Sequence, residues 1–141
     1  MDLSALFDQL CLRWAQEADV VAQQTGRLDP TLIVLPRDAT ADEVAIRLEG
    51  LRGNLPERAD AILADLRPQV SAYDPAGLVF MSEVKDGAVI YVSLGAAPLR
   101  RVEGFRIVDG VDGVKHLERT GELDATPYAW LDALLTPRPP R

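Results

Sequence analysis

The sequence is poor in cysteine and histidine, with one of each among 141 residues, Cys11 and His116. A single cysteine cannot form an intramolecular disulfide, so the fold does not depend on one, and a reducing compartment is favoured. One histidine and one cysteine cannot supply the four ligands of a structural zinc site. We therefore predict no metal site and a cytoplasmic location.

Long apolar runs are also missing. No stretch reaches the roughly 18 apolar residues that a membrane-spanning helix needs, and the N-terminus lacks the basic and apolar regions of a signal peptide. The net charge is −7, from 22 acidic and 15 basic residues. A dispersed negative charge repels a phosphate backbone, so we expect neither a membrane nor a nucleic-acid partner. Thirteen of the 15 basic residues are arginine, a bias associated with GC-rich bacterial genomes.

The familiar catalytic and phosphate-binding motifs are absent. The sequence contains neither a Walker A loop nor a Gly-x-Gly-x-x-Gly turn after a strand, so we expect no cofactor. Ser82 and Lys85 match the Ser-x-x-Lys string of serine acyl-enzymes. That chemistry requires the two side chains to be adjacent, whereas an odd spacing on a strand sends them to opposite faces. These absences favour a protein that is not an enzyme.

The first predicted element is an amphipathic helix over residues 3–24. Apolar residues recur along it at helical spacing, and the main stripe is Phe7, Cys11, Trp14, Ala18 and Val21. Gly26 is expected to end the helix. Cys11 lies within the apolar stripe, which predicts a buried and unreactive thiol.

Further helices are predicted on both sides of the main strand region. Thr40 and Glu43 form a capping box, which predicts a helix from residue 40 to about residue 51. Asn54 and Pro56 suit the start of the next helix, and Pro68 is expected to end or kink it. Its apolar face is Ala59, Ile62, Leu63, Leu66 and Val70. The last helix covers residues 127–135, with Thr126 as its N-cap.

The strands are predicted from apolar runs and from glycine turns. Residues 31–37 form a short apolar run that is typical of a buried strand. From residue 76 the apolar period changes from 3.6 to 2, and Asp86-Gly87 indicates a two-residue hairpin turn. This turn places Glu83 opposite Ile90 and Ser82 opposite Tyr91. Residues 101–108 continue the sheet, and residues 114–119 form an edge strand.

These elements predict an α+β fold of two layers, with an antiparallel meander sheet of 4–5 strands packed against 3–4 helices in the order α-β-α-α-β-β-β-(β)-α. We expect a single domain over residues 1–135 and a Pro-rich flexible tail over residues 136–141. Both faces of the hairpin are mostly apolar. Since helices in a two-layer fold cover one face only, we expect a second copy of the sheet to cover the other.

The sequence therefore favours a small cytosolic bacterial protein that acts without catalysis, as a protein-interaction or regulatory module and as a homodimer. A first alternative is a small-molecule or enzymatic pocket that uses Glu83, Tyr91 and His116. A second alternative is an acidic inhibitor or immunity-type protein, which the net charge of −7 permits. Arg101 and Arg106 complete the candidate ligand or interface residues, with exposed arginines on a strand edge as the competing interpretation.

Overall fold

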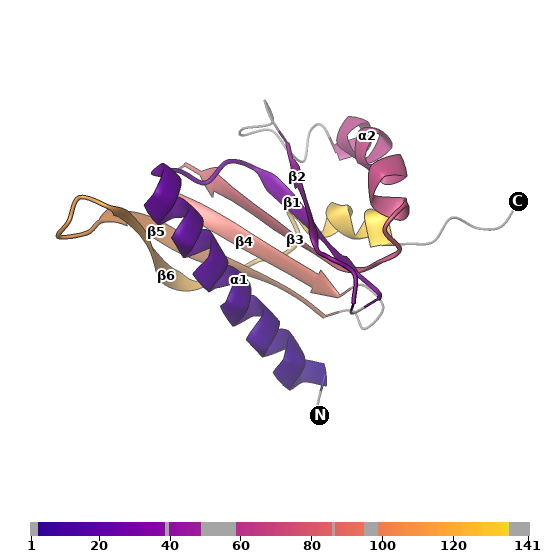
Figure 1. Cartoon of the computed structure of the whole chain (residues 1–141), viewed down its shortest axis with the longest axis horizontal. Helices are drawn as coiled ribbons and strands as arrows, with labels where there is room; N and C mark the ends of the chain where they lie inside the picture. The colour runs from indigo at the N-terminus through magenta and orange to yellow at the C-terminus, as the bar shows by residue number, and fades with distance from the viewer. Residues whose placement is uncertain (1–2, 39, 49–58, 86, 95–98, 136–141) are drawn as a thin grey trace, which may run out of the picture.

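The protein is described by a computed structural model that covers residues 3–38, 40–48, 59–85, 87–94 and 99–135 (Figure 1). These ranges form an open antiparallel sheet of six strands and three helices. The elements in chain order are α1 (Leu3–Thr25), β1 (Thr31–Pro36), β2 (Val44–Arg47), α2 (Ala59–Ser71), β3 (Pro75–Val84), β4 (Gly87–Leu94), β5 (Leu99–Asp109), β6 (Lys115–Leu123) and the 3₁₀-helix η2 (Ala129–Leu135). The predicted α+β class is confirmed, whereas the predicted 4–5 strands are too few, because β2 was expected to be a helix.

The helices cover both faces of the sheet, so the prediction of two layers is wrong. The strand order is β2-β1-β3-β4-β5-β6, and α1 crosses one face of this sheet diagonally (Figure 1). We call this face A and the opposite one face B. The core on face A contains Val79, Met81, Ala88, Ile90 and Val92 under α1, and the core on face B contains Leu78, Phe80, Val89 and Tyr91 under α2 and η2.

The covered faces remove the reasoning behind association through the sheet. Two apolar faces require two covers, as the sequence indicates, but α2 and η2 supply the second cover within the same chain. Leu66 and Val70 of α2 and Leu131 of η2 are at most 1% exposed against face B. The homodimer itself stays a prediction, and neither face of the sheet is left wholly uncovered to explain it.

Helix α1 follows its apolar stripe closely. Phe7, Cys11 and Trp14 are all less than 10% exposed, and Ala18 is fully buried. Val21, predicted on the same stripe, is 38% exposed instead, because it lies at the side of the buried stripe. Gly26 has φ 76° and donates its amide to the Ala22 carbonyl, which ends the helix as predicted.

The hairpin of β3 and β4 has the predicted faces but not the predicted register. Glu83 pairs with Ala88 and Ser82 pairs with Val89, so residues 85 and 86 lie between the paired ends Val84 and Gly87. The predicted pairs differ by two positions. Because side chains alternate with a period of two, this difference leaves every side chain on its predicted face. Asp86 lies outside the described residues.

The segment predicted as a capped helix is instead the strand β2, and the capping box is wrong. Thr40 donates both its amide and its hydroxyl hydrogen to Asp38 Oδ1 in a local turn, and Glu43 binds Arg13. Val44 and Ile46 are partly buried while Ala45 and Arg47 are exposed, which is a strand period. Pairing with β1 satisfies backbone groups that a helix could not satisfy there.

Helix α2 and the C-terminal region also differ in detail. Pro68 lies inside α2 and does not end it, because Ile62, Leu66 and Val70 hold the helix against face B while Pro68 is exposed. The predicted cap residues Asn54 and Pro56 lie outside the described residues, as does the predicted tail 136–141.

The last helix is a 3₁₀-helix, and the turn before it is stabilised by Asp124, which precedes the predicted cap residue Thr126. The residue that organises its start is Asp124, which accepts hydrogen bonds from the amide and hydroxyl of Thr126. The predicted cap residue Thr126 therefore donates its hydroxyl hydrogen to Asp124. The element itself is confirmed as η2.

The strand β6 is an edge strand, as predicted, and α1 contacts its first half. Its outer side meets α1, where Asp19 Oδ1 accepts the amide hydrogen of Leu117 at 2.7 Å. This contact occupies a backbone donor that an uncovered edge would offer to another chain. Within the described ranges, no helix is long and apolar enough to cross a membrane.

Candidate functional site

Glu83 stabilises the connection between α1 and β1 through two hydrogen bonds with Leu28. Its Oε1 accepts the Leu28 amide hydrogen at 2.6 Å, and its own amide donates to the Leu28 carbonyl at 2.9 Å. The partner of this carboxylate is a backbone amide, so the side chain acts as a structural acceptor next to the first residues of β1.

Tyr91 lies on face B, fully buried under η2. Its hydroxyl donates to Asp132 Oδ1 at 2.7 Å, and Asp132 Oδ2 lies 3.1 Å from Arg100 Nη2. Burial, together with the hydrogen bond to Asp132, raises the pKa of Tyr91 well above its usual range. The Tyr91 hydroxyl therefore stays protonated and donates to Asp132. This hydrogen bond holds η2 against the sheet.

His116 lies on β6, beside the C-terminal half of α1. Its Nδ1 is 3.9 Å from Asp19 Oδ1 and its Nε2 is 3.9 Å from Asp112 Oδ1, so both contacts are longer than hydrogen bonds. Its side chain is 37% exposed. No serine or cysteine is bonded to it among the described residues.

The two candidate arginines are engaged in ion pairs. Arg101 binds Asp8 of α1 at 2.7 Å and lies over the Phe7 ring at 5.2 Å. Arg106 binds Glu118 across β5 and β6, and both side chains are more than half exposed. Exposed pairs such as Arg106–Glu118 contribute little to stability, and both arginines already have a carboxylate partner.

The sequence-predicted residues therefore lie at separate positions. Glu83 contacts the α1 side of the sheet, Tyr91 contacts η2 on the opposite side, and His116 lies on the edge strand. Cys11 is buried, and burial raises the pKa of its thiol to about 11. A thiol in this state is a poor nucleophile at neutral pH, as the sequence indicated.

A different site lies on face A, where α1 leaves part of the sheet uncovered. A groove of about 500 Å³ runs between α1 and the strands β1 and β2. Its size falls in the range of ligand-binding clefts. Its apolar lining includes Trp14, Val21, Leu28, Ile33 and Met81.

The register of the strands defines the floor of this groove. Arg47 lies opposite Thr31, which lies opposite Met81, and these three residues form one row across β2, β1 and β3. Ala45 and Ile33 form the next row. The strand rises about 3.3 Å per residue, so the groove follows β2 for about 13 Å between Glu43 and Arg47.

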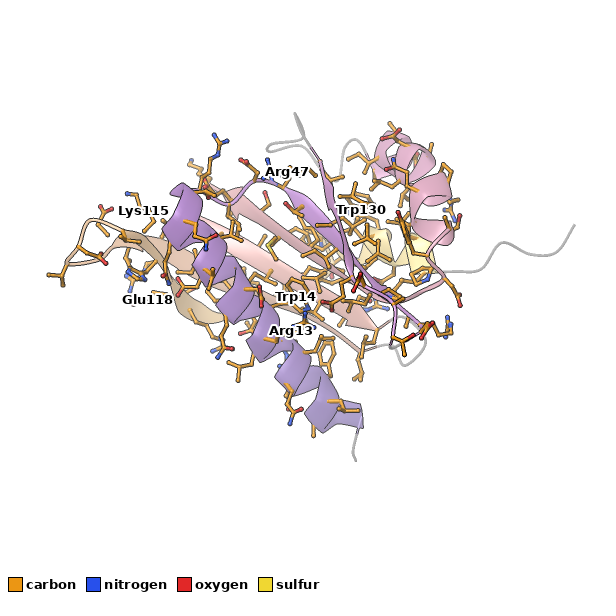
Figure 2. The ribbon with its side chains drawn as sticks, in the orientation of Figure 1. Arg13, Trp14, Arg47, Lys115, Glu118 and Trp130 are labelled. Atoms are coloured by element: carbon orange, nitrogen blue, oxygen red, sulfur yellow. The ribbon has the colours of Figure 1, made fainter. Side chains whose placement is uncertain are left out.

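One end of the groove is bridged by an ion pair. Arg13 of α1 binds both carboxylate oxygens of Glu43, with Arg13 Nη1 2.8 Å from Glu43 Oε2. This pair raises the pKa of Arg13. The guanidinium also lies over the Trp14 ring, 4.8 Å from its centroid (Figure 2). The pair fixes β2 to α1 beside the indole.

The indole of Trp14 carries a hydrogen-bond donor without a partner. Trp14 is only 8% exposed, and its Nε1 has no acceptor among the described residues. A buried donor of this kind costs about 1–3 kcal/mol if it stays unpaired. The second tryptophan differs, because Trp130 Nε1 donates to the Pro127 carbonyl at 2.9 Å. Ser93 Oγ and Asp132 Oδ2 are also buried without a hydrogen-bond partner among the described residues, and neither lines the groove.

The charges of the groove are mostly paired. Arg13 binds Glu43, and Arg27 lies 3.3 Å from Asp29. Glu17 adds to the negative charge around Arg13, one helical turn away. Arg47 has no hydrogen bond or ion pair to any described residue, and Figure 2 shows it apart from Arg13 and Trp14. Glu17 likewise has no hydrogen bond or ion pair to a described residue, so the groove offers two unused donors and one unused carboxylate.

Sequence reasoning missed this site for identifiable reasons. It placed Trp14 on the buried stripe, which is correct, but the missing acceptor is visible only in three dimensions. It assigned Glu43 to a capping box, so neither Glu43 nor Arg47 was expected on a strand. The alternation of exposed Ala45 and Arg47 with half-buried Val44 and Ile46 is the signal that indicates them.

Among the described residues, no three His, Cys, Asp or Glu side chains gather in a way that could hold a metal ion. Comparison with known proteins finds no family model, no curated protein and no solved structure that matches this chain.

Proposed function

We propose that this protein is a non-catalytic binding module, and that the groove between α1 and β1–β2 holds a segment of a partner protein. The observation that carries the proposal is the buried Trp14 N–H without an acceptor at the end of a groove of about 500 Å³. The indole nitrogen has almost no accessible surface in the unbound groove, so an acceptor on a bound segment would reach it by displacing the side chains that cover it, and apolar side chains of the segment would contact Ile33 and Met81.

The surroundings of the polar candidates support binding over catalysis. Glu83 accepts a backbone amide and Tyr91 donates to Asp132, so neither presents a free acid or base. A general base must lie within hydrogen-bond reach of the proton that it removes. The buried Cys11 thiol, with its pKa raised to about 11, is equally unsuited to attack a substrate. The single buried cysteine also supports a cytoplasmic location.

An extended polypeptide fits the groove better than a compact ligand. The lining follows β2 and α1, two elements that run alongside the groove, and it alternates apolar and charged side chains. Extended peptides are recognised by backbone hydrogen bonds together with pockets for alternate side chains. Trp14 Nε1 is suited to a backbone carbonyl, and the small side chain of Ala45 leaves room above β2.

The test is a selection of random octapeptides displayed on phage against the full-length protein, followed by affinity measurements with synthetic peptides. We expect selected peptides to bind Trp14→Phe about tenfold more weakly than the unchanged protein, because a hydrogen bond is lost. Trp130→Phe is the matched control, since its N–H is already bonded to Pro127. If no peptide is enriched, or if every enriched peptide binds Trp14→Phe as tightly as the unchanged protein, the proposal is overturned.

A further inference from the structure

We propose that the outer edge of β2 pairs with the same edge of a second copy of this chain, so that the two sheets continue into one across a symmetry axis at Ala45. This inference goes beyond the proposed function and does not rest on it. A segment in the groove would lie on face A, whereas the second copy pairs with β2 in the plane of the sheet. The observation that carries the inference is an unpaired strand edge whose charged side chains complement themselves.

The backbone of β2 has hydrogen-bonding groups that point away from the sheet. β2 is the terminal strand, and just after it the Leu48 amide donates to the Pro30 carbonyl at 2.9 Å. In an antiparallel pair, every second residue directs its amide and carbonyl toward the partner strand. Because Leu48 faces β1, the backbone groups of Glu43, Ala45 and Arg47 point outward. Among the described strands, none pairs with them there (Figure 1).

The opposite edge of the sheet is protected, which makes β2 the edge available for pairing. On β6, Asp19 of α1 occupies the outward amide of Leu117. The register of β5 and β6 also shifts between Gly104 and Phe105, and a shift of this kind disturbs a straight edge. No described side chain is hydrogen-bonded to the backbone of residues 44–47 in this way.

The side chains of β2 on face A complement themselves about Ala45. Glu43, Ala45 and Arg47 all line the groove, so they lie on the same side of the strand. When Ala45 lies opposite Ala45 of an antiparallel second copy, Arg47 of each copy lies opposite Glu43 of the other. Opposite charges directly across from each other stabilise a strand pair. Glu43 also binds Arg13, and a carboxylate has about four lone-pair sites, so it can accept from both arginines.

These charges distinguish the register centred on Ala45 from its neighbours. A symmetry axis at Ile46 places Arg47 opposite Ala45 and removes both charge pairs. An axis at Arg47 places two guanidinium groups opposite each other, and like charges in that position destabilise a strand pair. In the register centred on Ala45, each outward-facing residue also exchanges two backbone hydrogen bonds with the residue opposite.

The same register brings apolar side chains together on face B. Val44 of one copy lies opposite Ile46 of the other, and both are partly buried against the core of face B. Cross-strand neighbours at positions without hydrogen bonds approach closely, with about 4.5 Å between their Cα atoms. On face A, α1 leaves β2 open, and the two Ala45 side chains are small enough to face each other. The contact therefore has an apolar side and a charged side.

The pairing is short, so the association is expected to be weak. Strand β2 has four residues, and an interface of that length is smaller than the about 1,200 Å² that stable complexes bury. The net charge of −7 adds a repulsion between copies, which about 0.15 M salt largely screens. We therefore expect the dimer at high protein concentration only.

Sedimentation equilibrium of the full-length protein, up to about 1 mM and in about 0.15 M salt, tests the inference. We expect a monomer–dimer equilibrium that Arg47→Glu weakens about tenfold, because both charge pairs become pairs of like charge. The matched control is Arg37→Glu, which changes the net charge by the same amount. Arg37 follows β1, and its Nε lies 3.5 Å from Asp74 Oδ1. This control should associate as the unchanged protein does.

Mixing two variants separates a specific contact from a general loss of structure. Glu43→Arg, like Arg47→Glu, places like charges opposite each other when it pairs with itself. A mixed pair of the two variants has opposite charges at both positions. We expect the mixture to associate about tenfold more tightly than either variant alone. A variant that had lost the structure of β2 would not regain association on mixing.

Ala45→Pro tests the backbone pairing itself. It removes the outward amide at the symmetry axis and leaves the pairing with β1, to which this amide does not contribute. We expect association to be lost while far-UV circular dichroism stays unchanged. The inference is overturned if the unchanged protein remains a monomer up to about 1 mM. It is also overturned if Arg47→Glu and Ala45→Pro associate as the unchanged protein does, or if the mixture of folded variants associates no more tightly than each alone. A monomer whose selected peptides no longer bind Ala45→Pro would use this edge for another chain, which overturns the inference as well.

Discussion

At the scale of single residues, the tyrosine of face B shows how one hydrogen bond holds an element in place. Tyr91 is fully buried, and its hydroxyl donates to Asp132 of η2. We expect Tyr91→Phe to lower the free energy of unfolding by about 1–3 kcal/mol, because Asp132 loses a donor in a partly buried position. Urea denaturation measures the change. Tyr73→Phe, at a residue that is 44% exposed, is the control and should change little.

The thiol of Cys11 gives a pH-dependent prediction. Burial raises its pKa to about 11 from 9.0, so the folded state favours the protonated thiol. This contribution to stability is complete below pH 9 and is lost as the pH rises toward 11. We expect the unchanged protein to lose more stability than Cys11→Ala over this interval, as measured by urea denaturation at a series of pH values.

The same thiol should react slowly in the folded protein. A pKa shift of two units lowers the thiolate population near pH 8 about a hundredfold, and burial hinders access further. Labelling with a disulfide reagent should therefore be at least that much slower in the folded state than in guanidinium chloride. Equal rates in the two conditions would contradict the buried position of Cys11.

At the scale of elements, the connection between α1 and β1 depends on a side chain from β3. Glu83 Oε1 accepts the Leu28 amide hydrogen at 2.6 Å. We expect Glu83→Ala to cost about 1–3 kcal/mol, because a part-buried amide loses its acceptor, and Glu83→Gln to cost less because an acceptor remains. Hydrogen exchange at the Leu28 amide measures the local effect. Glu118→Ala, which removes an exposed ion pair with Arg106, should leave this amide unchanged.

The pattern of apolar residues predicts an element correctly where its period is regular over many residues. The two faces of the β3–β4 hairpin are correct, as are four of the five stripe residues of α1, because each side chain position follows from a fixed period. The hairpin register was wrong by two residues, since pairing depends on the turn and not on the alternation. Strand β2 was missed because it is only four residues long and follows a capping-box string. Its state is decided by pairing with β1, which is not a local property.

At the scale of the whole molecule, the sheet is enclosed by helices on both sides. The sequence pattern predicts two apolar faces, and the structure has both. The pattern does not show that α2 and the short 3₁₀-helix η2 together cover the second face. The candidate groove was outside the reach of sequence reasoning for the same reason. It exists because α1 crosses the sheet diagonally and leaves β1 and β2 partly open (Figure 1).

The cover on face B gives a prediction about association. Leu131 of η2 is 1% exposed, and a carboxylate placed there would be buried without a partner. We expect Leu131→Asp to detach η2, to expose Phe80 and Tyr91, and to produce dye-binding, self-associating protein. Sedimentation velocity and a hydrophobic dye measure this, and far-UV circular dichroism checks that the sheet is retained.

The control for this experiment is Val111→Asp, at a fully exposed position in the turn before β6. It should sediment as the unchanged protein does. If Leu131→Asp also keeps the original sedimentation and binds no dye, η2 is not the cover that keeps face B from other chains. If Leu131→Asp does self-associate, η2 covers face B in the unchanged protein, and a dimer of the unchanged protein would have to use another surface.

The place of β1 in the sheet bears on how the protein folds. Strands β3 to β6 are neighbours both in the chain and in the sheet, whereas β1 must reach β3 across the intervening α2. Closing that long loop costs more chain entropy than forming the meander. We expect the meander to form first, and β1 with β2 to join late and to open first. The groove would then be the last part of the molecule to assemble, so a bound segment would stabilise the protein where it is weakest and slow its turnover in the cell.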